Sequence, residues 1–223
     1  MSTEAESRFE GLPLTRLDVF DIPDVDLRRQ AIIEVFHPPL LALGNDLLPR
    51  LQPLAGTDLH IFQPRLNWPR SYKPFCTWMA ISREKQGYQA CGQLNVGAHR
   101  DYVAVRLGWD ASVPSYGRFE FLSRYRGIGD LLQTTAREHD LQFRVYSAAP
   151  WPVGSELEFV SKTDLDGAFA EVRRHGVWFE IGRRYDLPLH EKLVASPAFG
   201  DHVAQVFESL MPVYLRAAGR PRD

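Results

Sequence analysis

Four segments that alternate like β-strands carry tryptophans, amides and charged groups opposite their apolar positions. Alternate side chains of a strand point to opposite faces, so these residues would share one face of a sheet. They are Trp78, Gln93, Asn95, Tyr102, Arg106, Trp178 and Glu180. Indoles beside hydrogen-bonding groups are common in ligand pockets. Alternatively, these side chains could hold a loop of the chain itself against this face, and no ligand would then be needed to explain their types.

A run of basic residues overlaps this face. Between Arg65 and Arg106 there are seven Lys or Arg but only two acidic residues, in a chain of net charge −2. Interleaved aromatic residues would let the patch stack on rings and pair with anions. The favoured hypothesis is therefore a small anionic or nucleotide-like ligand. Its predicted binding residues are Arg65, Trp68, Trp78, Gln93, Asn95, Arg106 and Trp178.

Two alternatives use the same part of the chain. Single-stranded nucleic acid could bind the Arg65–Arg106 patch, although the negative net charge argues against a dedicated DNA-binding protein. An enzyme could use His60 and Glu180 as acid and base, because His60 precedes a proline-rich segment that could fold over the polar face. A histidine that donates to a loop carbonyl is the simpler explanation of His60.

Common catalytic and cofactor motifs are missing from the sequence. There is no GxxxxGK[ST] loop, no GxGxxG turn between a strand and a helix, and no GxSxG elbow. The seven histidines are scattered without an HExxH pair, and Cys76 and Cys91 lie fifteen positions apart. Zinc sites usually take ligands from closely spaced Cys and His residues. The sequence therefore predicts neither a metal nor a cofactor.

The elements expected to carry these residues alternate between strands and helices. Asp24 or Asp26 would cap a helix, and Pro38 and Pro39 would either end it or start a new one. A short helical piece would continue over residues 40–51, and a long loop would run from 49 to 74. The remaining elements are strands at 75–82, 93–98, 102–109, 141–147, 156–162 and 177–185 and helical segments at 115–140, 165–175 and 197–219. This order predicts an α+β fold, with helices on one face of an antiparallel sheet.

Composition places the chain among ordinary globular proteins, with 44% hydrophobic and 24% charged residues. Residues 1–16 are expected to form a flexible tail and residues 17–219 a single domain. The polar, acidic start does not resemble a signal peptide, and no apolar run reaches the roughly 18–20 residues of a membrane span. We therefore expect a cytoplasmic protein with no membrane partner.

The short motifs PRLNWP, TWMAIS and DYVAVRLG lie in a stretch that runs roughly from residue 20 to residue 214. Over this stretch the chain resembles the YktB-like bacterial proteins, a family defined as domain of unknown function 1054. Matching positions are His60, Arg65, Asn67, Thr77, Trp78, Ala80, Gly87, Tyr88, Gly97, Leu210, Pro212 and Tyr214. The family tends to have a second histidine where this chain has Pro64, and an Asp-His pair that RVYSAAPWP lacks.

The resemblance also implies a fold. It suggests the TATA-box-binding-protein-like α+β class, in which a curved antiparallel sheet carries helices on its convex side. One fold hosts many functions, so the resemblance implies no activity.

Overall fold

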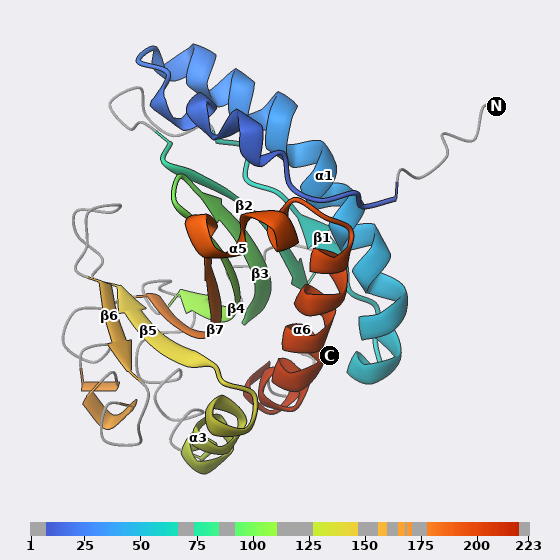
Figure 1. Cartoon of the computed structure of the whole chain (residues 1–223). Coiled ribbons are helices and arrows are strands. Elements are labelled where there is room, and N and C mark those ends of the chain that lie inside the picture. The colour runs from blue at the N-terminus through green and yellow to red at the C-terminus, as the bar shows by residue number, and fades with distance from the viewer. Residues whose placement is uncertain are drawn as a thin grey trace. The chain divides into compact units, whose positions relative to one another are not determined.

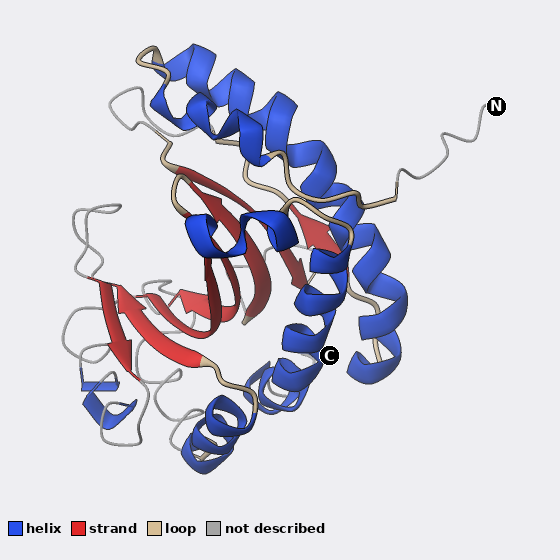
Figure 2. Ribbon diagram, viewed as in Figure 1, coloured by secondary structure: helices blue, strands red, loops and turns tan. Residues whose placement is uncertain are grey.

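Within the residues that the structure describes, the strands form one seven-stranded sheet in the order β1-β2-β3-β4-β7-β5-β6 (Figures 1 and 2). The computed structural model describes residues 8–66, 74–84, 92–110, 127–146, 156–159, 165–167, 169–170 and 178–218. The strands are β1 (His60–Phe62), β2 (Cys76–Ser82), β3 (Gln93–His99), β4 (Tyr102–Asp110), β5 (Gln142–Tyr146), β6 (Glu156–Phe159) and β7 (Trp178–Asp186). The helices are η1 (Leu14–Asp21), α1 (Val25–Ala55), α3 (Gly129–Glu138), α5 (Leu187–Val194) and α6 (Ala198–Ala218).

The predicted α+β class is confirmed. Strand β5 pairs antiparallel with both of its neighbours, β6 and β7. Each of the six strands expected from alternation is present. Where an end of such a strand lies in the described residues, it is within two residues of the expected position. The expected segment 115–140 contains α3, and its residues 115–126 lie outside the described residues. The likeness to the TATA-box-binding-protein class stays a prediction.

The chain divides into two compact units, each assembled from separate stretches of sequence. Unit 1 comprises residues 1–81, 95–104 and 184–205, and unit 2 comprises residues 82–94, 105–183 and 206–223. Trp109 and Phe143 of unit 2 stack on Phe179, with ring centroids 5.9 and 6.1 Å away. This aromatic cluster forms part of the apolar core of unit 2.

The segment expected to be a flexible tail is docked in unit 1 from Phe9 onward. Phe9 and Leu12 are each only 2% exposed. The Phe9 N–H donates to the Asp46 carboxylate, and the Leu12 N–H donates to the Val194 carbonyl. Between them, Gly11 has φ +116, and a Cβ there would lie 2.4 Å from the Ala195 carbonyl carbon. Burial and hydrogen bonds therefore fix this segment, while residues 1–7 lie outside the described residues.

Helix α1 begins where the sequence predicts, because the Asp24 carboxylate accepts the N–H groups of Asp26 and Leu27. The predicted interruption at Pro38–Pro39, by an end or a new start, is wrong: one helix continues through four prolines to Ala55, and Gly56 closes it at φ +63. The helical piece expected at 40–51 is confirmed as part of this helix. The predicted loop from 49 to 74 is therefore wrong at two places. Residues 49–55 belong to helix α1, and residues 60–62 form strand β1.

The physical reason for this longer helix is burial. Six large apolar side chains of α1 are at most 2% exposed: Ile32, Phe36, Leu40, Leu43, Leu47 and Leu51. An interior proline costs about 3 kcal/mol, whereas burying one such side chain contributes about 1.5–3 kcal/mol. A buried stripe that runs on both sides of the prolines can therefore outweigh the hydrogen bonds that they remove.

The half-buried His37 of α1 should make the stability of the protein depend on pH. Its Nε2 lies 3.1 Å from the Thr77 hydroxyl, and burial lowers the pKa of His37 below its ordinary value of 6.5. The unfolded chain then binds the proton more readily, so stability rises with pH. The contribution is complete above pH 6.5 and is lost as the pH falls through 6.5 towards the lowered pKa.

Denaturant unfolding at about pH 7.5 and about pH 5.5 measures this dependence. We expect His37→Gln to reduce the loss of unfolding free energy between the two pH values. His139→Gln is the control, because His139 is exposed and should leave the difference as in the wild-type protein. Equal pH dependence in the wild-type protein and in His37→Gln would contradict the assignment to His37.

Candidate functional site

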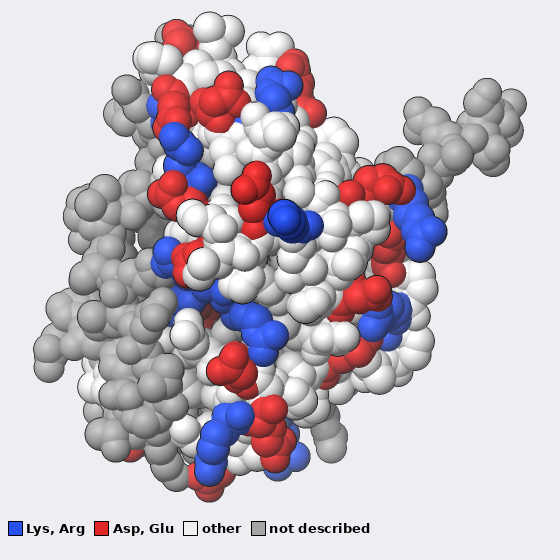
Figure 3. Space-filling view, in the orientation of Figure 1, with Lys and Arg blue, Asp and Glu red and all other residues white. Residues whose placement is uncertain are grey.

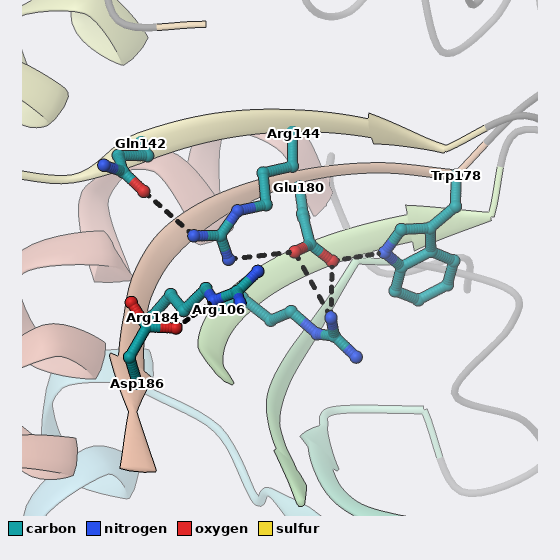
Figure 4. Close-up of polar contacts among 7 residues, drawn as sticks. All are labelled: Arg106, Gln142, Arg144, Trp178, Glu180, Arg184 and Asp186. Atoms are coloured by element: carbon teal, nitrogen blue, oxygen red, sulfur yellow. Dashed lines mark hydrogen bonds and ion pairs between the residues drawn. The ribbon is translucent and has the colours of Figure 1, made fainter. Parts of the chain in front are cut away.

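A buried carboxylate, Glu180 of β7, is the centre of a polar cluster in unit 2 (Figure 4). Arg106 Nη1 lies 2.9 Å from its Oε2 and 3.2 Å from its Oε1. The Trp178 indole N–H donates to Oε2 at 2.8 Å, and Arg144 Nη1 lies 3.8 Å from Oε1. We call these four residues the Glu180 cluster. Both carboxylate oxygens thus face donors or cations of the chain itself.

The strands place these side chains through their alternation and register. Trp178 and Glu180 are two residues apart on β7 and so share a face. The β5–β7 register sets Arg144 directly opposite Glu180. On the β4 side, a Cβ at Gly182 would lie 2.6 Å from the Arg106 Cα. The absence of a side chain at position 182 therefore lets the backbone at Arg106 approach β7.

The two arginines of the Glu180 cluster are held differently. Arg144, 2% exposed, donates from Nη2 to Gln142 Oε1 at 2.9 Å while Nη1 faces Glu180. Arg106, 8% exposed, uses Nη1 for Glu180, and its other terminal nitrogen points away from that carboxylate (Figure 4). Buried charges are costly unless they are paired, which explains why both guanidinium groups lie next to the carboxylate.

The Trp178 ring is held at one edge and on one side. Its N–H is bound to Glu180, and a Cβ at Gly108 of β4 would lie 2.3 Å from the ring atom Cζ2. The glycine therefore lets the indole lie against the β4 backbone. The side chain is still partly exposed. An aromatic surface is thus held in a fixed orientation beside a buried guanidinium group.

Unit 2 brings together three of the residues predicted for the site or for catalysis, namely Arg106, Trp178 and Glu180. Gln93, also predicted, is 2% exposed in the same unit. Sequence reasoning missed Arg144 and Gln142. The signal that could have found them is the alternation of β5, where these two polar residues lie between apolar ones.

The other predicted residues belong to unit 1 or lie outside the described residues. Asn95 is 3% exposed, His60 is partly exposed and Arg65 is exposed. Trp78 is partly exposed. Its neighbour Thr77 contacts His37 of helix α1, so Trp78 lies on the opposite face of β2, which points away from α1. The last predicted residue, Trp68, lies outside the described residues. A joint role for these residues stays a prediction.

Unit 1 has a polar-aromatic stack of its own. The rings of His99 and Tyr102 are parallel within 15° at 4.1 Å, and the Arg184 guanidinium lies 3.9 Å from the Tyr102 centroid. Arg184 Nε also donates to Asp186 at 2.7 Å, a contact drawn in Figure 4. Neighbouring side chains of unit 1 thus hold the Arg184 guanidinium in place.

The predicted basic patch carries less available charge than its composition indicates. Arg100 pairs with Asp21 at 2.7 Å, Arg83 lies 3.8 Å from Glu84, and Arg106 is buried against Glu180. Figure 3 shows Lys and Arg side chains close to Asp and Glu side chains on the face in view. Arg70, Lys73 and Lys85 lie outside the described residues. Pairing of this kind weakens attraction for a polyanion.

Within the described residues, no group of three His, Cys, Asp or Glu side chains could hold a metal ion. No helix in the described ranges is long and apolar enough to cross a bilayer.

The sequence matches a protein family and several bacterial relatives. The profile of the Domain of unknown function (DUF1054) matches residues 15–214. A UPF0637 protein of Listeria innocua is 25% identical over 214 residues, covering 94% of this chain and 98% of the relative. A UPF0637 protein of Exiguobacterium sibiricum is 26% identical, covering 88% and 93%. The chain therefore belongs to the DUF1054 family, the YktB-like family that its motifs resemble.

Proposed function

We propose that this protein binds a small anionic ligand at the Glu180 cluster, with Arg106 and Trp178 as the contacting residues. The single observation that carries the proposal is that one buried carboxylate orients both a guanidinium group and a partly exposed indole. Guanidinium groups bind carboxylates and phosphates through paired N–H donors. Arg144 and Glu180 would position the contacting residues, and Gln93 is a further candidate within unit 2.

The alternatives receive less support from the same residues. An acid–base role for Glu180 would need an oxygen within reach of a substrate proton. Arg106 and Trp178 already engage both oxygens, which suits a counter-ion better than a base. Single-stranded nucleic acid would need several available cations along a groove, whereas Arg100 pairs with Asp21 and Arg83 lies beside Glu84.

Calorimetric titration with inorganic phosphate and benzoate tests anion binding. We expect at least one of these probes to bind, and Arg106→Lys to weaken that binding about tenfold, because lysine keeps the charge but not the planar fork of donors. Arg50→Lys is the matched control, since Arg50 also pairs with a carboxylate at 2.9 Å but is 40% exposed and belongs to unit 1.

Two outcomes would overturn the proposal. One is that neither probe binds the wild-type protein. The other is that Arg106→Lys, folded by circular dichroism, binds as tightly as Arg50→Lys. A single-stranded oligonucleotide is the third probe: tight binding that weakens steeply with added salt would favour the nucleic-acid alternative instead.

A further inference from the structure

The Trp178 indole is held in place by its neighbours, although the residue is only partly buried. One edge is fixed by the 2.8 Å hydrogen bond to Glu180, and the β4 backbone at Gly108 lies against the ring. The side chain nevertheless keeps part of its surface exposed. A ring stacks more favourably on an aromatic side chain that the free protein already holds in place, because that side chain then loses little conformational entropy on binding.

The anion-binding group lies very near this ring. The indole nitrogen and Arg106 Nη1 both contact the same oxygen, Glu180 Oε2, at 2.8 and 2.9 Å. The two nitrogens are therefore at most about 6 Å apart, twice the length of a hydrogen bond. A ligand that stacks on Trp178 and pairs with Arg106 must carry its charge close to its ring.

We infer that the ligand is an aromatic carboxylate, with its ring on Trp178 and its carboxylate on Arg106. The inference rests on the proposed anion-binding function and narrows the ligand class. A carboxylate attached directly to a ring fits the short separation, whereas a nucleotide holds its phosphate away from the base by a sugar. The ion pair with Glu180 shows that this guanidinium group can bind a carboxylate.

Glu180 then acts as a positioning residue that touches no ligand atom. Its Oε2 fixes the indole and the guanidinium in one arrangement, and Arg144, anchored on Gln142, lies against its Oε1. Trp178→Phe would keep a ring but lose the hydrogen bond to Glu180. We expect this variant to retain part of the preference for aromatic ligands, whereas Trp178→Leu should lose it.

Four probes separate the ring from the charge: 2-naphthoate, cyclohexanecarboxylate, 2-naphthamide and inorganic phosphate. In calorimetric titrations we expect 2-naphthoate to bind about tenfold tighter than cyclohexanecarboxylate, the size of an aromatic stacking contribution. Trp178→Leu should reduce that ratio to about one, because leucine offers no aromatic face. Phe62→Leu is the control, since Phe62 is a partly exposed aromatic residue of β1 in unit 1, and it should keep the wild-type ratio.

The outcomes distinguish this inference from the function on which it rests. If both carboxylates bind equally, or phosphate binds and naphthoate does not, the aromatic ligand is wrong while anion binding stands. If Trp178→Leu keeps the wild-type ratio, the ring does not bind on Trp178. If naphthamide binds as tightly as naphthoate, the carboxylate does not contribute and the aromatic carboxylate is wrong as the ligand. If none of the four probes binds, the anion-binding function itself fails.

Discussion

Replacing Glu180 with alanine is expected to lower the free energy of unfolding by about 3–5 kcal/mol, the range for breaking a buried ion pair by removing one partner. The Glu180 side chain is 1% exposed and lies against two arginines whose side chains are at most 10% exposed. The variant would also remove the acceptor of the Trp178 indole N–H. Denaturant unfolding followed by circular dichroism measures the change.

Asp201→Ala is the matched control. Asp201 pairs with Arg50 at 2.9 Å, the distance that separates Glu180 from Arg106, but its side chain is 75% exposed. We expect this surface pair to contribute less than about 1 kcal/mol, because water screens it. The two pairs thus differ mainly in burial. Similar losses of unfolding free energy in Glu180→Ala and Asp201→Ala would contradict the role assigned to the buried carboxylate.

Gly182→Ala should destabilise the sheet at the Glu180 cluster. The added Cβ would lie 2.2 Å from the Val105 carbonyl oxygen and 2.6 Å from the Arg106 Cα, and both are backbone atoms of β4. Backbone cannot rotate aside as a side chain can, so β4 and β7 would have to separate. We expect a loss of about 3 kcal/mol in unfolding free energy, at the upper end for overpacking.

Gly129→Ala provides the comparison for this glycine. A Cβ at Gly129, the first residue of α3, would meet no atom within 4 Å. Alanine also favours the helix over glycine by up to about 1 kcal/mol, so this variant should be as stable as the wild-type protein or slightly more stable. If Gly182→Ala unfolds at the same denaturant concentration as Gly129→Ala, close approach of the two strands is not required.

Local sequence signals predicted most of the elements in the described residues. Alternation located each strand of the sheet except β1, because the two faces of a half-buried strand differ in polarity. Helical spacing predicted the apolar stripe of α6, of which Phe199, Phe207 and Tyr214 are at most 1% exposed. The same local rules failed at Pro38 and Pro39, because burial of the α1 stripe is a tertiary effect that a proline rule does not include.

The sequence by itself determined which residue types share a face of each strand, and so it pointed to Arg106, Trp178 and Glu180. Only the tertiary structure decided that Glu180 pairs with Arg106, 74 positions away, and that Arg144 lies beside Glu180. Alternation fixes the face of a side chain, but it carries no information on strand order or register. Those depend on contacts between strands, such as the close approach of Gly182 to Arg106.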